Sequence, residues 1–211
     1  MMATTRQCNE PQCRPAGTPM LLVHDESDPR RRAVEGFIQD IYDRRYGAQV
    51  THFAPTLVAL WEGARITAAA GYRSAGQGPL FLERYLPQPV EQLLGAHAGG
   101  GVPSRRQVVE VGHLAAARAG EGRRLVLMMG PHLAGRGFEW VVSTLTGELR
   151  QLFLRMGIVP LTLGVADPAL LGEDVRHWGT YYDHNPVVLA GSLPRAMRHI
   201  VRYAASTGID T

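Results

Sequence analysis

The order of the predicted elements indicates an α/β protein with a mixed central sheet flanked by helices. Three observations carry this prediction: an apolar strand over 107–117, a strand over 138–145, and a strand over 160–165 that follows a helix with one apolar face. Strands that alternate with helices in this order usually pair in parallel through right-handed crossovers. We therefore expect at least part of the sheet to be parallel.

The chain is long enough for one domain with a hydrophobic core. It has 211 residues, of which 45% are hydrophobic, and a chain of this length is most simply a single domain. The first residues contain several prolines and few apolar side chains. We therefore expect a flexible tail over 1–19 and one domain over 20–211.

The domain is predicted to begin with a strand and a helix. Met20–Val23 is a short apolar strand candidate. Asp28 before Pro29 is typical of a helix start, because aspartate caps free N–H groups and proline is tolerated at the first helical position. Gly47 is placed to end this helix. Its buried face is predicted by apolar residues at helical spacing, namely Val34, Phe37, Ile38, Ile41 and Tyr42.

The segment before residue 107 is predicted to be rich in turns. Two strands are expected over 56–61 and 65–72, joined by a hairpin turn at Glu62-Gly63. The elements expected next are a short extended segment over Leu80–Tyr85, a helix from Pro89 to Leu94 and a glycine-rich loop over Ala98–Pro103.

The strand over 107–117 is expected at the centre of the sheet, because it is apolar on both faces. Gly130-Pro131 is expected to kink or end the helix that covers Arg123–Met129. Thr146 is expected to cap the next helix, and Gly157 to end it. The buried face of that helix is predicted to contain Leu149, Leu152, Phe153 and Met156. A strand over Val187–Ala190 and a helix over Pro194–Ala205 are expected after it.

All 22 basic residues are arginines. Without lysine the protein has no Schiff-base chemistry and no P-loop lysine for a nucleotide phosphate. A net charge of +3 is too small to predict nucleic-acid binding. The arginine clusters at 30–32, 44–45, 105–106 and 123–124 are either solvated surface residues or contacts for a phosphate or an acidic protein.

The sequence gives no sign of membrane insertion, secretion or metal binding. No apolar run reaches the ~18 residues that span a bilayer, and no secretory signal pattern precedes the domain. We therefore expect a cytoplasmic protein. Cys8 and Cys13 lack further ligands nearby that would complete a metal site, so free thiols are expected and no metal.

Gly120 and Gly122 lie between the predicted central strand and the next helix. Small residues at a helix N-terminus let backbone N–H groups approach an anion, and Arg118, Arg123 and Arg124 add positive charge. The turn is therefore either a pyrophosphate cradle or an ordinary glycine turn.

Glu110 stands between two valines of the central strand. Burial would raise its pKa and suit it to general-base catalysis, whereas pairing with an arginine would make it structural. His113 falls on the opposite face by strict alternation, but a bulge at Gly112 would bring both side chains to one side. Without that bulge His113 is a core residue.

The segment 178–186 combines aromatic residues with Gly and Pro. Tyr181 is a candidate general acid and Tyr182 a candidate substrate contact, unless this is a plain packed loop. Arg73 and Glu83 are candidates for binding a polar substrate, and each is otherwise a surface residue.

Several motifs carry a resemblance to known families. Arg118-Ala119-Gly120-Glu121-Gly122 after a central strand resembles the coenzyme A pyrophosphate turn of GNAT acyltransferases. Arg73, Gly78-Pro79 and Glu110–Leu114 resemble motifs of acyl-homoserine lactone synthases, with His113 at the position of an arginine. The span 29–191 resembles the thermostable hemolysin family, through Tyr46-Gly47-Ala48, Phe53-Ala54-Pro55, Leu82–Leu86, Val109–Gly112, Met156-Gly157-Ile158 and Trp178–Tyr182.

The resemblance to acyltransferases implies a GNAT-like domain that moves an acyl group to a small amine. The implied donor is an acyl-CoA or an acyl carrier protein, with no covalently bound cofactor. Backbone N–H groups near Leu114 and Ala116 would hold the thioester carbonyl, and Glu110 would be the general base. Arginine pairs would suit docking of an acidic carrier protein. The alternatives are a membrane-active hemolysin, as the family name implies, and a ligand-binding module without catalysis.

Overall fold

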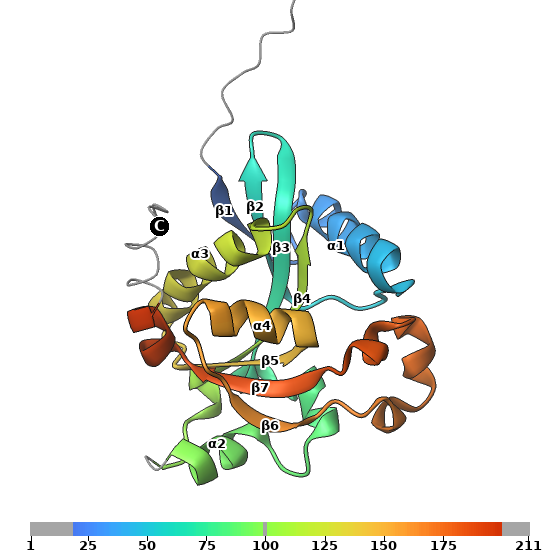
Figure 1. The fold of residues 1–211 in the computed structure, drawn as a ribbon. Helices are drawn as coiled ribbons and strands as arrows, with labels where there is room; N and C mark the ends of the chain where they lie inside the picture. Colours follow the sequence, from blue (N-terminus) through green and yellow to red (C-terminus); the bar gives the residue numbers. More distant parts are fainter. Residues whose placement is uncertain (1–18, 99–100, 200–211) are drawn as a thin grey trace, which may run out of the picture.

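The computed structural model describes residues 19–98 and 101–199. Both cysteines and residues 1–18 of the predicted tail lie outside them. Within the described residues, seven strands, four helices and a further helical stretch over 193–199 are joined by turns and short 3₁₀ helices (Figure 1). The strands are β1 (Met20–His24), β2 (Thr56–Glu62), β3 (Arg65–Ser74), β4 (Val108–Ala116), β5 (Trp140–Leu145), β6 (Leu161–Val165) and β7 (Val187–Ser192). The helices are α1 (Arg31–Tyr46), α2 (Val90–Ala98), α3 (Glu121–Gly135) and α4 (Gly147–Arg155). The longer 3₁₀ helices are η2 (Phe81–Tyr85), η4 (Pro168–Trp178) and η5 (Tyr181–His184).

One mixed sheet in the order β1-β2-β3-β4-β5-β7-β6 contains all seven strands. β4 is its middle strand, as its apolar sequence predicts, and the β4–β5 pair is parallel whereas the other pairs are antiparallel. Helices α1 and α3 cover opposite faces of the sheet (Figure 1). The α/β class and the mixed sheet flanked by helices are confirmed.

β4 and β5 pair over a short length and then diverge. Their register partners are Val108↔Trp140, Val109↔Val141 and Glu110↔Val142. From Val111 onward β4 has no partner in β5, and the two strands run apart in Figure 1. The divergence leaves an opening in the middle of the sheet, with β4 on one side and β5 on the other.

The alternation of side chains assigns one core to each face of the sheet. Val109 and Val111 of β4 pack with Leu125 and Met129 of α3. Ala115 of β4 instead belongs to a cluster on the other face, together with residues of α1, β2 and β3. Such clusters hold the two helices in place, because most helical stability in a folded protein comes from tertiary packing.

The start of α1 differs from the prediction. Asp28 accepts a hydrogen bond from the Arg30 N–H at 2.7 Å, and the helix begins only at Arg31. Asp28 therefore stabilises the turn before the helix instead of capping the helix itself. The end of α1 at Gly47 is confirmed, since this residue has φ 62°, a left-handed conformation that glycine adopts without strain.

The prediction that Leu80–Tyr85 is extended is wrong. Phe81–Tyr85 form the 3₁₀ helix η2. The Glu83 carboxylate accepts the Leu80 N–H at 2.8 Å, which closes the turn locally. Tertiary hydrogen bonds from Phe81 and Leu82 to Glu110 hold it against β4, and no local sequence pattern reports such bonds.

Helix α3 begins earlier and ends later than predicted. It starts at Glu121 and continues through Pro131 to Gly135, so Gly130-Pro131 does not end it. Proline removes one backbone hydrogen bond, while the buried side chains of Leu125, Met129 and Leu133 on both sides of Pro131 hold the helix against the sheet.

The C-terminal elements largely follow the prediction. Thr146 precedes α4, but its side chain makes no capping hydrogen bond and is buried. Gly157 has φ 75° just after the helix, as expected of a stop. Met156 is buried, whereas Leu149, Leu152 and Phe153 are partly exposed. Residues 193–199 are helical, and the rest of the predicted C-terminal helix lies outside the described residues.

Candidate active site

A bulge in β4 shapes the site. Gly112 faces Gly71 of β3 and Ala115 faces Ala69, so His113 and Leu114 together oppose the single residue Ala70. His113 adopts φ 54°, a left-handed conformation that costs roughly 1–2 kcal/mol in a residue with a Cβ. The extra residue reverses the alternation of side chains along the strand.

The bulge brings Glu110 and His113 to the same face of the sheet. Val109 and Val111 pack toward α3, so Glu110 points to the α1 face. The His113 ring also lies on that face, with centroid distances of 6.5 Å to Tyr42 of α1 and 5.6 Å to Phe53. The sequence is compatible with a regular strand, which would separate Glu110 and His113, and with a bulge, which would bring them together. The structure has the bulge.

Gly71 of β3 makes room for the His113 ring. A Cβ at this position would lie 2.8 Å from the Ala54 Cβ and 3.1 Å from His113 Nδ1. The first distance is shorter than packed carbon atoms adopt. A glycine is therefore required where the bulge, β3 and the loop after α1 meet.

Glu110 is partly buried at the point where β4 and β5 part. Its Oε2 accepts the Phe81 N–H at 2.8 Å, and its Oε1 accepts the Leu82 N–H at 3.0 Å. Burial raises the pKa of this carboxyl, although the two hydrogen bonds and the Arg73 charge oppose the shift. A carboxylate with a raised pKa is suited to accept a proton near neutral pH.

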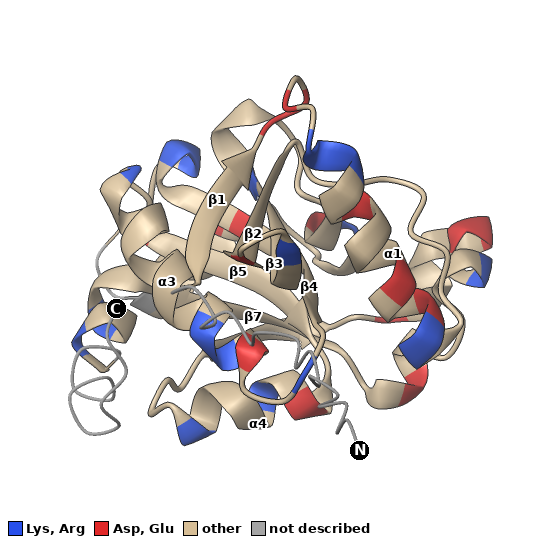
Figure 2. Ribbon diagram, turned by 90° about the horizontal axis from the view of Figure 1, so that it is seen from above, with Lys and Arg blue, Asp and Glu red and all other residues tan. Residues whose placement is uncertain are grey.

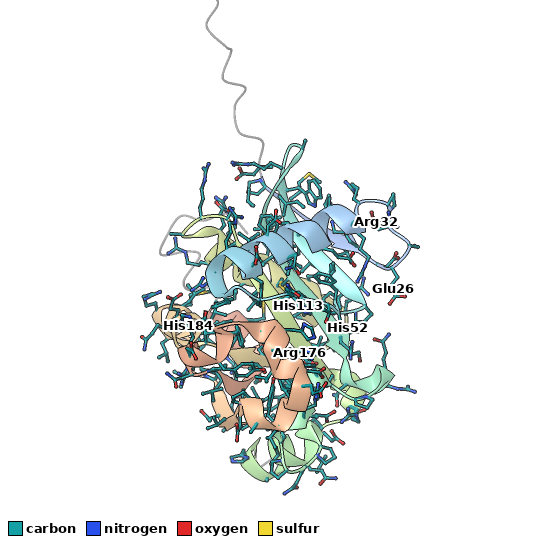
Figure 3. The ribbon with its side chains drawn as sticks, turned by 90° about the vertical axis from the view of Figure 1, so that its right-hand side faces the viewer. Glu26, Arg32, His52, His113, Arg176 and His184 are labelled. Atoms are coloured by element: carbon teal, nitrogen blue, oxygen red, sulfur yellow. The ribbon has the colours of Figure 1, made fainter. Side chains whose placement is uncertain are left out.

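His113 is neutral at physiological pH. Burial lowers its pKa to about 4, and a hydrogen bond to the backbone of His52 only partly opposes the shift. Its Nδ1 is buried and has no hydrogen-bond partner within the residues that the structure describes. Figure 3 shows His113 and His52 between α1 and the C-terminal 3₁₀ segments.

Arg73 lies next to Glu110 across the strand pair. It is partly exposed, and it donates no hydrogen bond and forms no ion pair within residues 19–98 and 101–199. Its charge still lowers the pKa of both Glu110 and His113. Arg73, Glu110 and His113 together form a polar cluster on the α1 face of the sheet.

Glu83 has a structural environment. It accepts hydrogen bonds from Arg105 at 2.7 Å and 3.0 Å and from the Val90 N–H at 3.0 Å. Burial alone would raise the pKa of Glu83, but these bonds and that from Leu80 lower it overall. Arg105 also donates to Glu91 and to two carbonyls. The carboxylate of Glu83, a predicted substrate contact, is thus already hydrogen-bonded to other residues of the protein.

Aromatic residues form one wall beside the polar cluster. The Tyr181 hydroxyl donates to the Thr144 carbonyl of β5 at 3.2 Å, and its ring stacks on Tyr42 of α1. The Tyr182 hydroxyl is 2.6 Å from that of Tyr85. Burial raises the pKa of Tyr181 and of Tyr182, so both phenols keep their protons. Tyr181 thereby links α1 to the edge of β5.

The predicted phosphate cradle lies where β4 passes into α3. Gly120 precedes the helix with φ 94°, and a Cβ at Gly122 would meet nothing closer than 3.6 Å. Arg118 is exposed beside this turn. Arg124 lies 3.6 Å from Glu62 and 3.7 Å from Glu121. The turn can therefore admit an anion, although the Glu121 carboxylate in the first turn opposes it.

The edge of β4 that faces the opening carries backbone groups without a strand partner. Ala117 donates its N–H to the Thr67 carbonyl of β3. Because backbone groups alternate between the two edges of a strand, the Ala116 N–H and C=O point toward β5. Leu114 belongs to the bulge, where this alternation is interrupted, and its side chain lines the cavity on the α3 face.

A cavity of about 90 Å³ lies on the α3 face at this opening. Ser143 is the one hydroxyl among lining residues that are otherwise apolar or glycine. The lining comes from five labelled elements, the loop before β6 and the helical stretch over 193–199. It consists of Val111 and Leu114 of β4, Val126, Met129, Gly130 and Leu133 of α3, Val141, Ser143 and Leu145 of β5, Phe153 of α4, Leu189, Ala190 and Gly191 of β7, and Ile158, Pro160, Leu193 and Ala196. Sequence reasoning missed this cavity, because no single element indicates it.

Figure 2 shows basic and acidic residues interspersed over α1, α3 and α4. Arg45 of α1 pairs with Glu148 of α4, and Arg105 is committed to Glu83 and Glu91. Arg44 and Arg106 are exposed. The predicted arginine clusters are therefore partly structural and partly solvated.

Residues 24–197 match the model of the family described as Thermostable hemolysin. No curated protein sequence matches the chain. Within the described ranges, no helix is both long and apolar enough to cross a membrane.

The fold is similar to that of solved acyl-transferring enzymes. The acyl-homoserine lactone synthase BjaI, described as CoA-dependent and solved with MTA, has a TM-score of 0.63 at 15% identity, with 92% of each chain covered. FeeM, an N-acyl amino acid synthase from uncultured soil microbes, has a TM-score of 0.58 at 16% identity, covering 89% of this chain and 99% of its own. The synthase LasI has a TM-score of 0.55 at 12% identity, covering 83% and 91%. These likenesses show the shared GNAT-like fold.

Proposed function

Because the chain belongs to the thermostable hemolysin family and has a GNAT-like fold, we propose that it transfers an acyl group from a thioester to an amine. One observation carries the proposal. Glu110 is the last residue of β4 that pairs with β5, and Val111, the next residue, lines the apolar cavity on the other face. The divergence therefore places an apolar cavity and a polar cluster on the two sides of one opening.

The donor, an acyl-CoA or an acyl carrier protein, fits the α3 side. Its acyl chain would occupy the cavity, since burial of each methylene group stabilises binding by about 0.8 kcal/mol. Its phosphates would lie at Gly120 and Gly122, at the N-terminus of α3, beside Arg118 and Arg123. The similar structure of BjaI, an acyl-homoserine lactone synthase described as CoA-dependent and solved with isopentyl-CoA, supports this choice of donor.

The amine acceptor fits the α1 side. Its nitrogen attacks the thioester carbonyl, so that a C–N bond forms and the C–S bond breaks. Glu110 accepts the proton that the nitrogen loses, and the leaving thiolate is protonated in turn. The N–H groups of Leu114 and Ala116 would stabilise the oxyanion, a contribution of about 3–4 kcal/mol per donor in other enzymes.

We assign different roles to the other predicted catalytic residues. The neutral His113, whose Nδ1 is buried, maintains the bulge beside Glu110. Tyr181, which lies at the edge of β5, is a candidate to donate a hydrogen bond to the leaving thiolate, which takes up the proton that Glu110 has accepted. Its hydroxyl would have to release the Thr144 carbonyl to do so.

The test is mass spectrometry of products after incubation with acyl-CoA and acyl-carrier thioesters and a panel of amines. We expect an N-acyl product and free thiol in equal amounts. Thioester binding without any product would support the ligand-binding alternative. Release of dye from phosphatidylcholine liposomes, without product, would support the membrane activity named in the family description.

A further inference from the structure

We propose that the acceptor carries a carboxylate beside its amine, as an α-amino acid does, and that Arg73 binds this carboxylate. The inference rests on the proposed function and names the acceptor class of the same site. It is carried by the Arg73 guanidinium, which has no hydrogen-bond or ion-pair partner among residues 19–98 and 101–199.

Arg73 points into the acceptor side of the sheet. Its neighbour Tyr72 belongs to the core under α3, so alternation along β3 directs Arg73 to the α1 face, with Glu110 and His113. The side chain is partly exposed and has no hydrogen-bond or ion-pair partner within the described residues. A partly desolvated charge without a partner costs free energy, which a bound carboxylate would recover.

Glu110 does not satisfy Arg73, although the two residues are opposite each other. Both Glu110 oxygens accept backbone N–H groups of η2, and the pair forms no ion pair. Side chains of opposite residues begin about 5 Å apart. A fixed carboxylate and a free guanidinium at this spacing match a zwitterion in which one carbon carries the ammonium and the carboxylate.

The other charged groups near the cluster are already engaged. Arg31, the second cation that acts on His113, donates to the carbonyls of Ala54 and Pro55 and to Glu35. Arg84 pairs with Asp174, and His113 is neutral. Arg73 is thus the cation of this cluster that is free to bind a substrate carboxylate in bidentate geometry.

The experiment compares three acceptors that share one side chain: phenylalanine, phenylalanine amide and phenethylamine. Wild-type protein, Arg73→Met and Arg73→Lys are assayed for thiol release with the best acyl thioester. Binding of each acceptor without donor is measured by calorimetry. Arg65→Met is the matched control, since Arg65 lies on the same strand and pairs with Glu62 at its other end.

We expect the wild type to prefer the amino acid over both analogues. Loss of a charge-assisted contact predicts that Arg73→Met lowers kcat/KM for the amino acid by roughly 10- to 100-fold, mainly through KM. The rates with the amide and the amine should change less than the rate with the amino acid, because for them Arg73→Met removes only the charge that acts on Glu110. Arg73→Lys should restore part of the preference. Arg65→Met should behave as the wild type.

The outcomes separate this inference from the proposed function. Turnover of amines with no preference for the carboxylate, unchanged in Arg73→Met, overturns the inference and leaves the acyl transfer standing. Amino-acid binding that requires Arg73, without any acyl product, supports the inference and contradicts the transfer. A wild-type protein that neither binds nor acylates any of the three overturns both.

Discussion

The two faces of β4 differ sharply in character, although one strand builds both. On the α3 face Val111 and Leu114 line an apolar cavity. On the α1 face Glu110 and His113 lie beside Arg73, among hydrogen bonds and charges. A strand normally separates its faces by strict alternation, and here the bulge at His113 redistributes the side chains. The position of His113 beside Glu110, on the proposed acceptor side, therefore depends on one inserted residue.

The largest effect is expected on the polar face, from Glu110→Gln. Loss of a general base predicts a fall in kcat of roughly 100- to 10,000-fold, measured by thiol release. In wild type kcat/KM should fall as the pH drops through the raised pKa of Glu110. Glu110→Asp keeps a carboxylate while shortening the anchor to η2, so it should recover part of the rate. Full turnover by a folded Glu110→Gln protein would contradict the assignment.

The next effect concerns His113 and pH. The pKa of His113 is about 4 in the folded protein against an ordinary 6.5, so the unfolded chain binds the proton more tightly. Its contribution to stability is complete above pH 6.5 and is lost as the pH falls toward 4, up to about 3 kcal/mol. His113→Asn, which tolerates the left-handed conformation, should flatten this part of the curve.

Urea unfolding of both proteins between pH 7 and pH 4 measures this difference. Glu110 shifts in the opposite sense, because its raised pKa favours the folded state at low pH, and it is present in both proteins. The comparison therefore isolates His113. Equal slopes in the two proteins would show that His113 is not buried in its neutral form.

Two facing glycines test the geometry of the bulge. Gly71→Ala would place a Cβ 2.8 Å from that of Ala54 and should cost about 1–3 kcal/mol through overpacking. Gly112→Ala, at the residue directly opposite, meets nothing within 4 Å and is the control. Thermal unfolding of both variants should show a lower Tm for the first alone; equal losses would argue against the packing described for His113.

The smallest effect is expected on the apolar face. Val126 lines the cavity from α3 and is partly exposed, so Val126→Phe can fill space with little strain. Relative kcat/KM should fall about tenfold for long acyl chains, equivalent to about 1.4 kcal/mol, and stay constant for short ones. A uniform loss across chain lengths would place the acyl chain elsewhere.

Sequence reasoning predicted the elements of the fold better than the contacts of the site. The apolar run of β4 and the periodicity of α1 are local signals, and both elements were found where expected. The 3₁₀ helix η2 was missed because Glu110, 29 residues from Phe81, supplies its hydrogen bond. Proline in α3 is tolerated because the sheet buries both halves of the helix.

The site residues show the same limit. Glu110 was singled out as a carboxylate within an apolar strand, and the bulge was one of two open possibilities. The cavity is lined by several elements that lie far apart in the sequence, from β4 to the helical stretch over 193–199. Arg73 forms no ion pair with Glu110, because both Glu110 oxygens accept N–H groups of η2. These contacts exist only in the folded chain, so the sequence could not predict them.

The short β4–β5 junction has a consequence for how the chain assembles. β1 to β4 form an antiparallel meander that is consecutive in sequence, and β5, β7 and β6 form a second local unit. Units rich in local contacts close with less loss of chain entropy than distant strand pairs. Just three register pairs join the two units. The opening between them exists only once both units have formed and met, so the assembly of the sheet and the assembly of the site are one event.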